Sequence, residues 1–390
     1  MSAIGVIAEF NPIHTGHVYL LSEAKKHGTV VAVISGNFVQ RGDIAIAEKR
    51  VRAKAALLCG ADLVLELPVT YSMSTAQNFA LGGVFTLKAM GCDSLIFGSE
   101  CGDITELEKA CGVLKSGKFS EEAEKLLGSG MTFAAAREKA AELAGLDSGV
   151  LKGANNNLAV EYMLAAENIG ADFEYFTVKR QGAVHDSQIS CKGFASASLL
   201  RKKLLEGDYG FCRKYIPENV SGLFTEENTA DIKRIENAVL AVLRCRSIQE
   251  LKGLPDISEG IENKLFSAIR VAKSLDELYN TVKVKRYTHA RIRRLALNAF
   301  IGAGSAFFMK PPPYVRVLGF NPRGEALLKK NASASPVPVI TRAAQTAALN
   351  AGALGLFQTE CRAADLYSLA LKKIKPCGTE YTAKIIKTEC

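Results

Sequence analysis

Short apolar runs alternate with longer segments of helical periodicity along the first half of the chain. The runs predict five strands, at residues 4–8, 30–34, 63–67, 94–97 and 172–178. The periodic segments predict helices at residues 18–26, 47–59, 76–90 and 195–205. The run at 63–67 lacks polar alternation, which is typical of a strand buried on both faces. The order of these elements indicates βαβ units and an α/β fold with a parallel sheet.

The rest of the chain is mostly helical. Residues 103–150 are rich in Ala, Glu, Lys and Leu without a clear strand, so we expect a helical insertion there. Small residues at 207–210 fit a domain boundary. Beyond it, the pattern predicts helices at 235–245, 261–272 and 288–300, then, after three prolines, two short strands at 315–318 and 337–340 that flank a short helix. We therefore expect an α/β domain at residues 1–206 and a mainly helical, basic domain at 207–390.

Charge is distributed unevenly between these two parts. Residues 1–206 hold 21 Lys and Arg against 23 Asp and Glu, whereas residues 207–390 hold 28 against 17. The second part therefore carries an excess of 11 positive charges, which suggests that it meets a polyanion. A basic surface kept for solubility is the alternative.

Composition narrows the class of protein further. No stretch approaches the roughly 20 apolar residues of a membrane span, and the N-terminal residues do not resemble a signal peptide. The ten cysteines are scattered and form no C-x-x-C pair, which indicates reduced thiols. We expect a cytoplasmic protein with no membrane partner; its oligomeric state stays open.

The turn after the first predicted strand carries the clearest chemistry. In Asn11-Pro12-Ile13-His14-Thr15-Gly16-His17, two histidines one helical turn apart open a helix. Free backbone N–H groups and the helix dipole at such a position favour phosphate, and Gly16 permits close approach of a ligand. The alternatives are a zinc pair, for which nearby ligands are absent, or two ordinary surface histidines. We expect a phosphate site and no protein-bound metal.

A second segment matches the first in chemistry. Ser196-Ala197-Ser198-Leu199-Leu200-Arg201 places serines at a helix start and an arginine one turn further on. Ser198 and Arg201 suit phosphate oxygens, although a plain capped helix has the same pattern.

Three further segments have weaker signals. The loop at 35–43 follows the second strand on the ligand side of the sheet, so Asn37, Gln40 and Arg41 are candidates for substrate contact. Basic residues at 48–54 indicate either a solvated helix face or an RNA contact. His185 and Asp186 follow the fifth strand and receive no role.

The strongest candidate for RNA binding lies at residues 283–294. No Asp or Glu occurs between Glu277 and Glu325. Arg291 and Arg294 lie one helical turn apart and suit a phosphate backbone, and Tyr287 suits stacking on a base. The full set is Lys283, Lys285, Arg286, Tyr287, Arg291 and Arg294. A solvent-facing basic helix is the alternative.

The two phosphate segments together resemble the HxGH and S-x-S/T-x-x-R motifs of the nucleotidyltransferase superfamily. The superfamily has a Rossmann-like sheet and transfers nucleotidyl groups from ATP or CTP. A closer resemblance, to the bacterial tRNA(Met) cytidine acetate ligase family, extends over most of the chain. It rests on Asn11-Pro12-Ile13-His14, Ser35-Gly36-Asn37-Phe38-Val39-Gln40-Arg41-Gly42, Gly60-Ala61-Asp62-Leu63-Val64-Leu65-Glu66-Leu67-Pro68, Phe97-Gly98-Ser99-Glu100 and Lys285-Arg286-Tyr287-Thr288.

That resemblance implies a reaction and its partners. The family activates acetate with ATP, together with Mg²⁺, as acetyl-adenylate. It then acetylates N4 of the wobble cytidine of elongator tRNA(Met), releasing AMP and pyrophosphate, and it has no DNA partner. The rivals are a nucleotidyltransferase that acts on a small metabolite and an RNA-binding protein without catalysis.

The resemblance also implies positions for the ATP site. Two departures from the family pattern are Ala154, where Pro is usual, and Thr15, where Asn is frequent. His14 and His17 would hold phosphate during adenylation, Ser198 and Arg201 would bind the pyrophosphate side, and the 35–43 loop would lie near acetate or the cytosine. The ATP positions are Ile7, Ala8, Glu9, Phe10, Asn11, Pro12, Ile13, His14, Thr15, Gly16, His17, Val18, Tyr19, Leu20, Gly98, Asn155 and Arg180.

Overall fold

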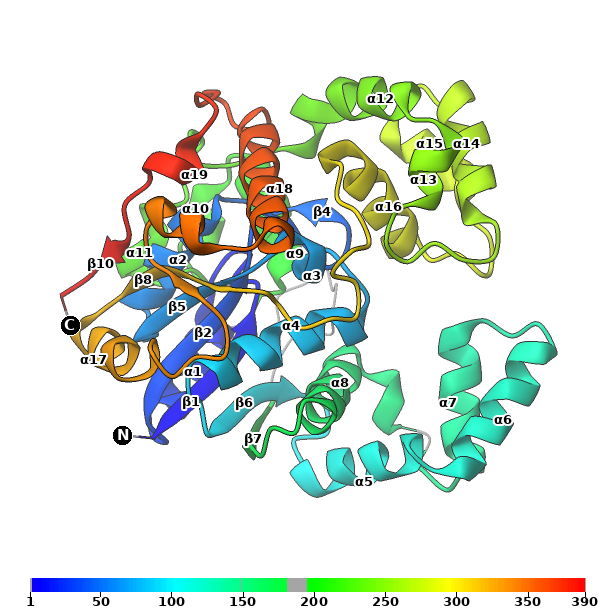
Figure 1. Cartoon of the computed structure of the whole chain (residues 1–390), viewed down its shortest axis with the longest axis horizontal. Coiled ribbons are helices and arrows are strands. Elements are labelled where there is room, and N and C mark those ends of the chain that lie inside the picture. The colour runs from blue at the N-terminus through cyan, green and yellow to red at the C-terminus, as the bar shows by residue number, and fades with distance from the viewer. Residues whose placement is uncertain (1, 148, 181–194, 390) are drawn as a thin grey trace.

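A mixed β-sheet forms the centre of the molecule (Figure 1). The structure is a computed structural model that describes residues 2–147, 149–180 and 195–389. Eight strands of these residues form the sheet, in the order β10-β8-β5-β2-β1-β6-β7 with β9 beside β8. Their bounds are β1 Ala3–Ala8, β2 Thr29–Ser35, β5 Leu63–Leu67, β6 Ser94–Ser99, β7 Glu174–Lys179, β8 Val315–Phe320, β9 Val339–Ile340 and β10 Ile386–Lys387.

The five strands of the first half pair in parallel, as the sequence predicts. β1 lies between β2 and β6; β5 continues the sheet beyond β2, and β7 continues it beyond β6. The strand order therefore reverses at β1. Ligands of open α/β sheets bind at the carboxyl ends of the strands next to such a reversal. The end of β1 is the position that the HxGH turn occupies.

Helices cover both faces of the sheet, which explains the uninterrupted apolar strands. Val30, Ala32 and Ile34 of β2 belong to one hydrophobic core, and the alternate residues Val31 and Val33 belong to another. The first core includes residues of α1 (Thr15–Ala24), α2 (Lys49–Leu58) and α9 (Ala197–Leu205). The second includes residues of α4 (Ala76–Ala89) and α8 (Ala154–Asn168).

Two groups of helices project from this body (Figure 1). The helical insertion is confirmed and consists of α5 (Ile104–Leu114), α6 (Gly117–Gly128) and α7 (Phe133–Leu143). A helical region in the second half has its own hydrophobic core. It consists of α12 (Glu236–Cys245), α13 (Ile248–Lys252), α14 (Ile261–Val271), α15 (Leu275–Val282) and α16 (His289–Ile301), which confirms the three helices predicted there.

The sheet does not end with the first half of the chain. β8 comes from the second half and pairs antiparallel with β5, and β10 then pairs with β8. The sequence predicts the strand at 315–318 but assigns it to the helical domain, so the expected division at residue 206 does not separate the sheet from the rest. A six-residue strand after a proline run gives no signal about which strand it will join.

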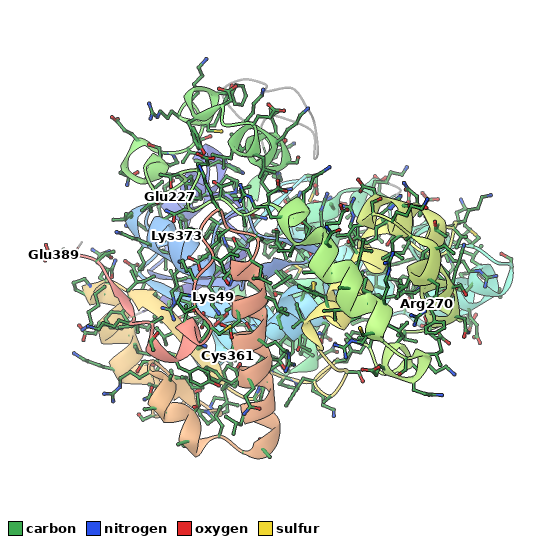
Figure 2. The ribbon with its side chains drawn as sticks, turned by 90° about the horizontal axis from the view of Figure 1, so that it is seen from above. Lys49, Glu227, Arg270, Cys361, Lys373 and Glu389 are labelled. Atoms are coloured by element: carbon green, nitrogen blue, oxygen red, sulfur yellow. The ribbon has the colours of Figure 1, made fainter. Side chains whose placement is uncertain are left out.

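Buried charges connect the two halves beneath this added strand. Lys49 of α2 forms ion pairs with Glu66 of β5 and, at 3.1 Å, with Glu380. Arg316 of β8 pairs with Glu380 at 2.7 Å, and Glu360 lies 4.0 Å from the Lys49 ammonium. Figure 2 shows Lys49 close to α18 (Ala351–Ser368), the helix that carries Cys361. Segments about 300 residues apart are thereby held together.

The remaining elements are mostly short, and the long helix among them, α18, has a buried face. In the described ranges no helix is both long and apolar enough to cross a membrane. The strands of a small hairpin are β3 (Phe38–Val39) and β4 (Asp43–Ile44), and the other helices are α3 (Val69–Ser72), α10 (Tyr209–Cys212), α11 (Glu218–Ser221), α17 (Pro322–Asn331), α18 (Ala351–Ser368) and α19 (Thr379–Thr382), with 3₁₀ turns at Val150–Lys152, Ile232–Ile235 and Ala343–Ala348.

Candidate active site

The turn between β1 and α1 holds the two histidines face to face. His14 is the N-cap residue of α1, and its Nδ1 accepts a hydrogen bond from Gly16 N–H at 3.1 Å. The rings of His14 and His17 lie 3.9 Å apart between centroids, with 30° between their planes. The rings of Phe10 and His17 pack edge to face, with 5.1 Å between their centroids. The two imidazoles thus form one rigid surface at the end of the central strand.

The backbone N–H groups of this turn are not free, contrary to expectation. Thr15 N–H donates to the Tyr215 carbonyl at 2.9 Å, and His17 N–H donates to the His14 carbonyl at 2.8 Å. Gly16 N–H is taken by the His14 ring. A helix start usually has open donors, but here the chain fills them itself. Ligand contacts must therefore come mainly from side chains.

Both imidazoles are neutral near neutral pH. The pKa of His14 is lowered to about 4 by loss of hydration and by the charges of Arg180 and Arg201. The pKa of His17 lies well below its usual value, because of burial and then of the charges of His14 and Arg180. Since Nδ1 of neutral His14 accepts a bond, its proton resides on Nε2, which makes Nε2–H a donor.

Two buried polar atoms of the turn are unpartnered in the described part of the chain. These are Nδ1 of His17 and Oγ1 of Thr15. An unsatisfied buried polar atom costs about 1–3 kcal/mol, so such atoms mark sites that a ligand completes. Their position beside the histidine pair agrees with a ligand site there.

Two arginines reach this surface from distant parts of the sequence. Arg201 of α9 donates from Nη1 to the Asn11 carbonyl at 2.9 Å, so the serine-arginine segment contacts the histidine turn as expected. Ser196 caps α9, and its hydroxyl lies 3.1 Å from that of Ser198. Arg180 follows β7, and its charge, like that of Arg201, acts on His14. The site is therefore cationic without any protonated histidine.

Asn155 already has partners within the protein. Its amide nitrogen donates to Glu100 at 2.5 Å, and its amide oxygen accepts from Arg180 Nη1 at 2.9 Å. Since an amide has two N–H groups and two oxygen lone pairs, one of each remains for a nucleotide. A Cβ at Gly98 would lie 3.4 Å from the Arg180 side chain. Asn155 orients Arg180 and is itself fixed by Glu100, a residue at the end of the fourth strand to which the sequence patterns give no role.

The loop at 35–43 forms the β3–β4 hairpin over the turn. Asn37 is buried, and its side-chain oxygen accepts from Lys49 N–H at 2.8 Å, so it begins α2 rather than contacting a substrate. Gln40 N–H donates to the Glu9 carboxylate at 3.0 Å. Arg41 is exposed. Of the three candidates for substrate contact, Gln40 and Arg41 lie at the tip of the hairpin.

Two of the basic residues of α2 are neither a solvated face nor an RNA contact, whereas Arg50 is half-buried and Lys54 is exposed. Lys49 and Arg52 are both buried. Arg52 donates to the carbonyls of Ala47 at 2.8 Å and Glu9 at 2.7 Å, and it also contacts that of Gly36. This guanidinium therefore fastens the ends of β1 and β2 together beneath the site.

Most of the predicted RNA contacts on and before α16 have internal partners. Arg291 donates to the Asp256 carbonyl at 2.9 Å, and Arg294 pairs with the Asp256 carboxylate at 3.0 Å. Tyr287 is only 6% exposed and donates to the Glu259 carbonyl, so its ring does not present a face for a base. Lys283 donates to the Tyr287 carbonyl at 2.9 Å. The exposed members of the predicted set are Lys285 and Arg286.

No cluster of three or more His, Cys, Asp or Glu side chains in the described ranges has the arrangement of a metal site. His185 and Asp186 lie outside the described residues.

Comparison with known proteins decides the family. The model of the HIGH nucleotidyl transferase family matches residues 1–381. A Thermoanaerobacter protein named tRNA(Met) cytidine acetate ligase is 37% identical over 99% of this chain and 100% of its own length. A relative of the same name from Caldanaerobacter subterraneus is 36% identical with the same coverage. The chain belongs to the tRNA(Met) cytidine acetate ligase family.

Solved structures of this ligase family agree with the fold. Thermotoga maritima TmcAL bound with alpha-thio ATP is 28% identical and superposes with a TM-score of 0.92 over the full length of both chains. The apo form of the same protein gives a TM-score of 0.94. The Rossmann-like α/β architecture with its helical C-terminal region is thereby established.

Proposed function

We propose that this chain is an ATP-dependent ligase that activates acetate as acetyl-adenylate and acetylates N4 of the wobble cytidine of elongator tRNA(Met). One observation carries the proposal: His14, His17, Arg180 and Arg201 converge at the end of β1. Family membership supplies the substrates, since the relatives are named for tRNA(Met), cytidine and acetate. The reaction assigns the protein to the cytoplasm.

The first half-reaction joins acetate to the α-phosphate of ATP. An acetate oxygen attacks that phosphorus, and the bond to pyrophosphate breaks. The Nε2–H of His14 and the guanidinium groups of Arg180 and Arg201 stabilise the charge that shifts onto the phosphate oxygens. Ser198 and Arg201 hold the departing pyrophosphate. The ATP lies along residues 7–20 and beside Gly98, and Mg²⁺ accompanies its phosphates.

Neutral histidines suit this task. An imidazole with a low pKa donates one fixed hydrogen bond without losing its proton to the reacting oxygens. The positive charge comes from the two arginines, which stay protonated throughout. No side-chain nucleophile is needed, because positioning and electrostatic stabilisation dominate reactions at phosphorus.

The second half-reaction transfers the acetyl group to RNA. The cytosine amine attacks the carbonyl carbon, and AMP leaves. The excess of basic residues after residue 206 supports binding of the tRNA phosphates there. Before the start of α16, Lys285 and Arg286 are the exposed side chains that we assign to RNA. We assign Gln40 and Arg41, at the tip of the hairpin, to substrate contact.

Incubation of the protein with ATP, labelled acetate and bulk tRNA tests the proposal. We expect tRNA-dependent incorporation of label and release of AMP. Label on a small metabolite without tRNA would indicate a nucleotidyltransferase of small molecules. Tight tRNA binding without ATP turnover would indicate a non-catalytic RNA-binding protein.

A further inference from the structure

Asp43 lies on the hairpin that separates the ATP turn from the helical region. It is the first residue of β4 and pairs with Val39 of β3. The hairpin is pressed against α16: a Cβ at Gly42, which has φ +71°, would collide with the backbone nitrogen of Arg294. Asp43 thus stands where the catalytic sheet meets the first turns of α16.

The same hairpin is fastened to the ATP turn. Ile46 N–H, three residues after Asp43, donates to the side-chain oxygen of Asn11 at 2.7 Å. Arg201 donates to the carbonyl of the same Asn11 at 2.9 Å. Asn11 is therefore a shared anchor for the chain that carries Asp43 and for the arginine that we assign to pyrophosphate. The backbone that carries Asp43 accordingly lies beside the nucleotide site, and the charge of Arg201 acts on the Asp43 carboxylate.

The side chain of Asp43 has fewer partners than the carboxylates of Glu66, Glu380 and Glu100. Glu66 and Glu380 form ion pairs, and Glu100 accepts bonds from two backbone N–H groups and an amide. Asp43 accepts one bond, at 2.8 Å from the N–H of the next residue, and forms no ion pair within the described ranges.

Charges of both signs surround this carboxylate. Arg201 of α9 and Arg293 of α16 lower its pKa and Asp231 raises it, but loss of hydration is the largest influence and leaves the pKa above the ordinary value. Arg293 has a buried Nε without a partner in the described part of the chain. A polar substrate group between the two arginines would therefore meet an acceptor on Asp43.

We propose that Asp43 is a catalytic residue of acetyl transfer, which accepts the proton that leaves the exocyclic amine of the cytidine. This inference rests on the proposed function. The nitrogen lone pair forms a bond to the acetyl carbon, the bond from that carbon to the phosphate oxygen breaks, and AMP leaves with the electron pair. The proton passes from nitrogen to the Asp43 carboxylate and then to water. A carboxylate is also the acceptor that recognises a cytosine amine.

Other bases near the turn are less suited. His14, with a pKa of about 4 and its Nδ1 already bonded, is a weak acceptor. The Glu9 carboxylate accepts the Gln40 N–H and is directed towards the hairpin backbone. A general base is most effective when its pKa approaches the working pH, which favours a carboxyl whose pKa burial has raised.

The test separates the two half-reactions in the full-length enzyme. Asp43→Asn keeps the shape and loses the base, whereas Asp43→Glu keeps a carboxylate. Acetate-dependent exchange of labelled pyrophosphate into ATP reports adenylation without tRNA. Single-turnover transfer from preformed acetyl-adenylate to tRNA reports the second step. Asp103→Asn, which replaces a helix-capping carboxylate of the insertion, is the matched control.

We expect Asp43→Asn to keep exchange within about twofold and to lower the transfer rate about 10²- to 10⁴-fold, the usual contribution of a general base. Asp43→Glu should recover part of that rate. Transfer by the wild type should rise with pH through one ionisation, and that rise should vanish in Asp43→Asn.

Unchanged transfer in Asp43→Asn would overturn the inference. A parallel loss of exchange and transfer would also overturn it, by assigning Asp43 to nucleotide binding or to the folding of the hairpin, which thermal unfolding of the variant distinguishes. If the wild type itself shows no acetate-dependent exchange, the proposed function fails instead.

Discussion

Two groups of cationic and aromatic side chains in this protein look alike in sequence and differ in what they touch. In the group at the β1–α1 turn, the arginines contact neutral carbonyl or amide oxygens. In the group on and before α16, Arg291 and Arg294 both reach Asp256, and Tyr287 is buried. Their partners distinguish them: one group is arranged for a ligand, and the other holds the helical region together.

The largest effect should come from the turn. His14→Ala removes the Nε2–H donor and one face of the imidazole pair. We expect adenylation, measured as acetate-dependent pyrophosphate exchange, to fall about 10²- to 10³-fold, as when a preorganised donor is removed. Binding of tRNA should stay unchanged. His289→Ala, on the exposed start of α16, is the matched control and should leave exchange intact.

The α16 arginines should behave as structural residues. Removing both with Arg291→Ala and Arg294→Ala breaks charge-assisted bonds to Asp256 and Ser258. We expect the free energy of unfolding in urea to fall by about 2–4 kcal/mol, because such bonds contribute roughly 1.5–3 kcal/mol each and are not additive. If the double variant instead showed a large decrease in the salt dependence of tRNA binding and unchanged stability, these arginines would be RNA contacts rather than structural residues.

The exposed residues Lys285 and Arg286 on the same segment should affect tRNA binding and leave stability unchanged. Lys285→Ala with Arg286→Ala should leave urea unfolding within about 0.5 kcal/mol. The slope of log affinity for tRNA against log salt should become shallower by up to about 2, because each basic side chain that neutralises a phosphate adds roughly one unit. The control replaces Lys109 and Lys118 on the insertion, where no change of slope is expected. An unchanged slope in the test variant would mean that RNA binds elsewhere.

The smallest expected effect is the change in stability with pH that follows from protonation of His14. Because the folded pKa of His14 is about 4 and lies below its usual value, the unfolded chain binds the proton more tightly. The contribution of His14 to stability is therefore complete above about pH 6.5 and is lost as the pH falls towards 4. Histidine NMR titration should show this low pKa in the free protein and a higher one when ATP phosphates bind. A His14 that titrates near 6.5 without ATP would contradict the description of the turn.

Sequence patterns predict the parts of this fold that depend on local or periodic information. The five parallel strands follow from apolar runs, and α16 follows from its helical spacing. Sequence patterns do not predict which residues the side chains contact. Asp256, which occupies Arg291 and Arg294, lies 35 or more residues away in a loop with a positive φ. No local pattern indicates that this loop will meet the helix.

In the candidate active site, too, local motifs are predictable from the sequence and long-range contacts are not. The HxGH and serine-arginine segments are predictable because the residue types that bind phosphate occur together in short motifs. The carbonyl of Tyr215, which occupies the Thr15 N–H, and the Glu100 carboxylate, which takes up Asn155, depend on long-range folding. These contacts change which atoms remain for a ligand, so motifs locate the site but do not specify its donors.

The late strand β8 has a consequence for synthesis of the protein on the ribosome. Until residues 315–320 emerge, β5 presents an unpaired edge, and Lys49 lacks the counter-charge of Glu380. Lys49 then has Glu66 as its counter-charge without Glu380, and an open strand edge invites aggregation. A nascent chain that contains every adenylation motif is therefore incompletely folded, and truncated products should be cleared by proteases.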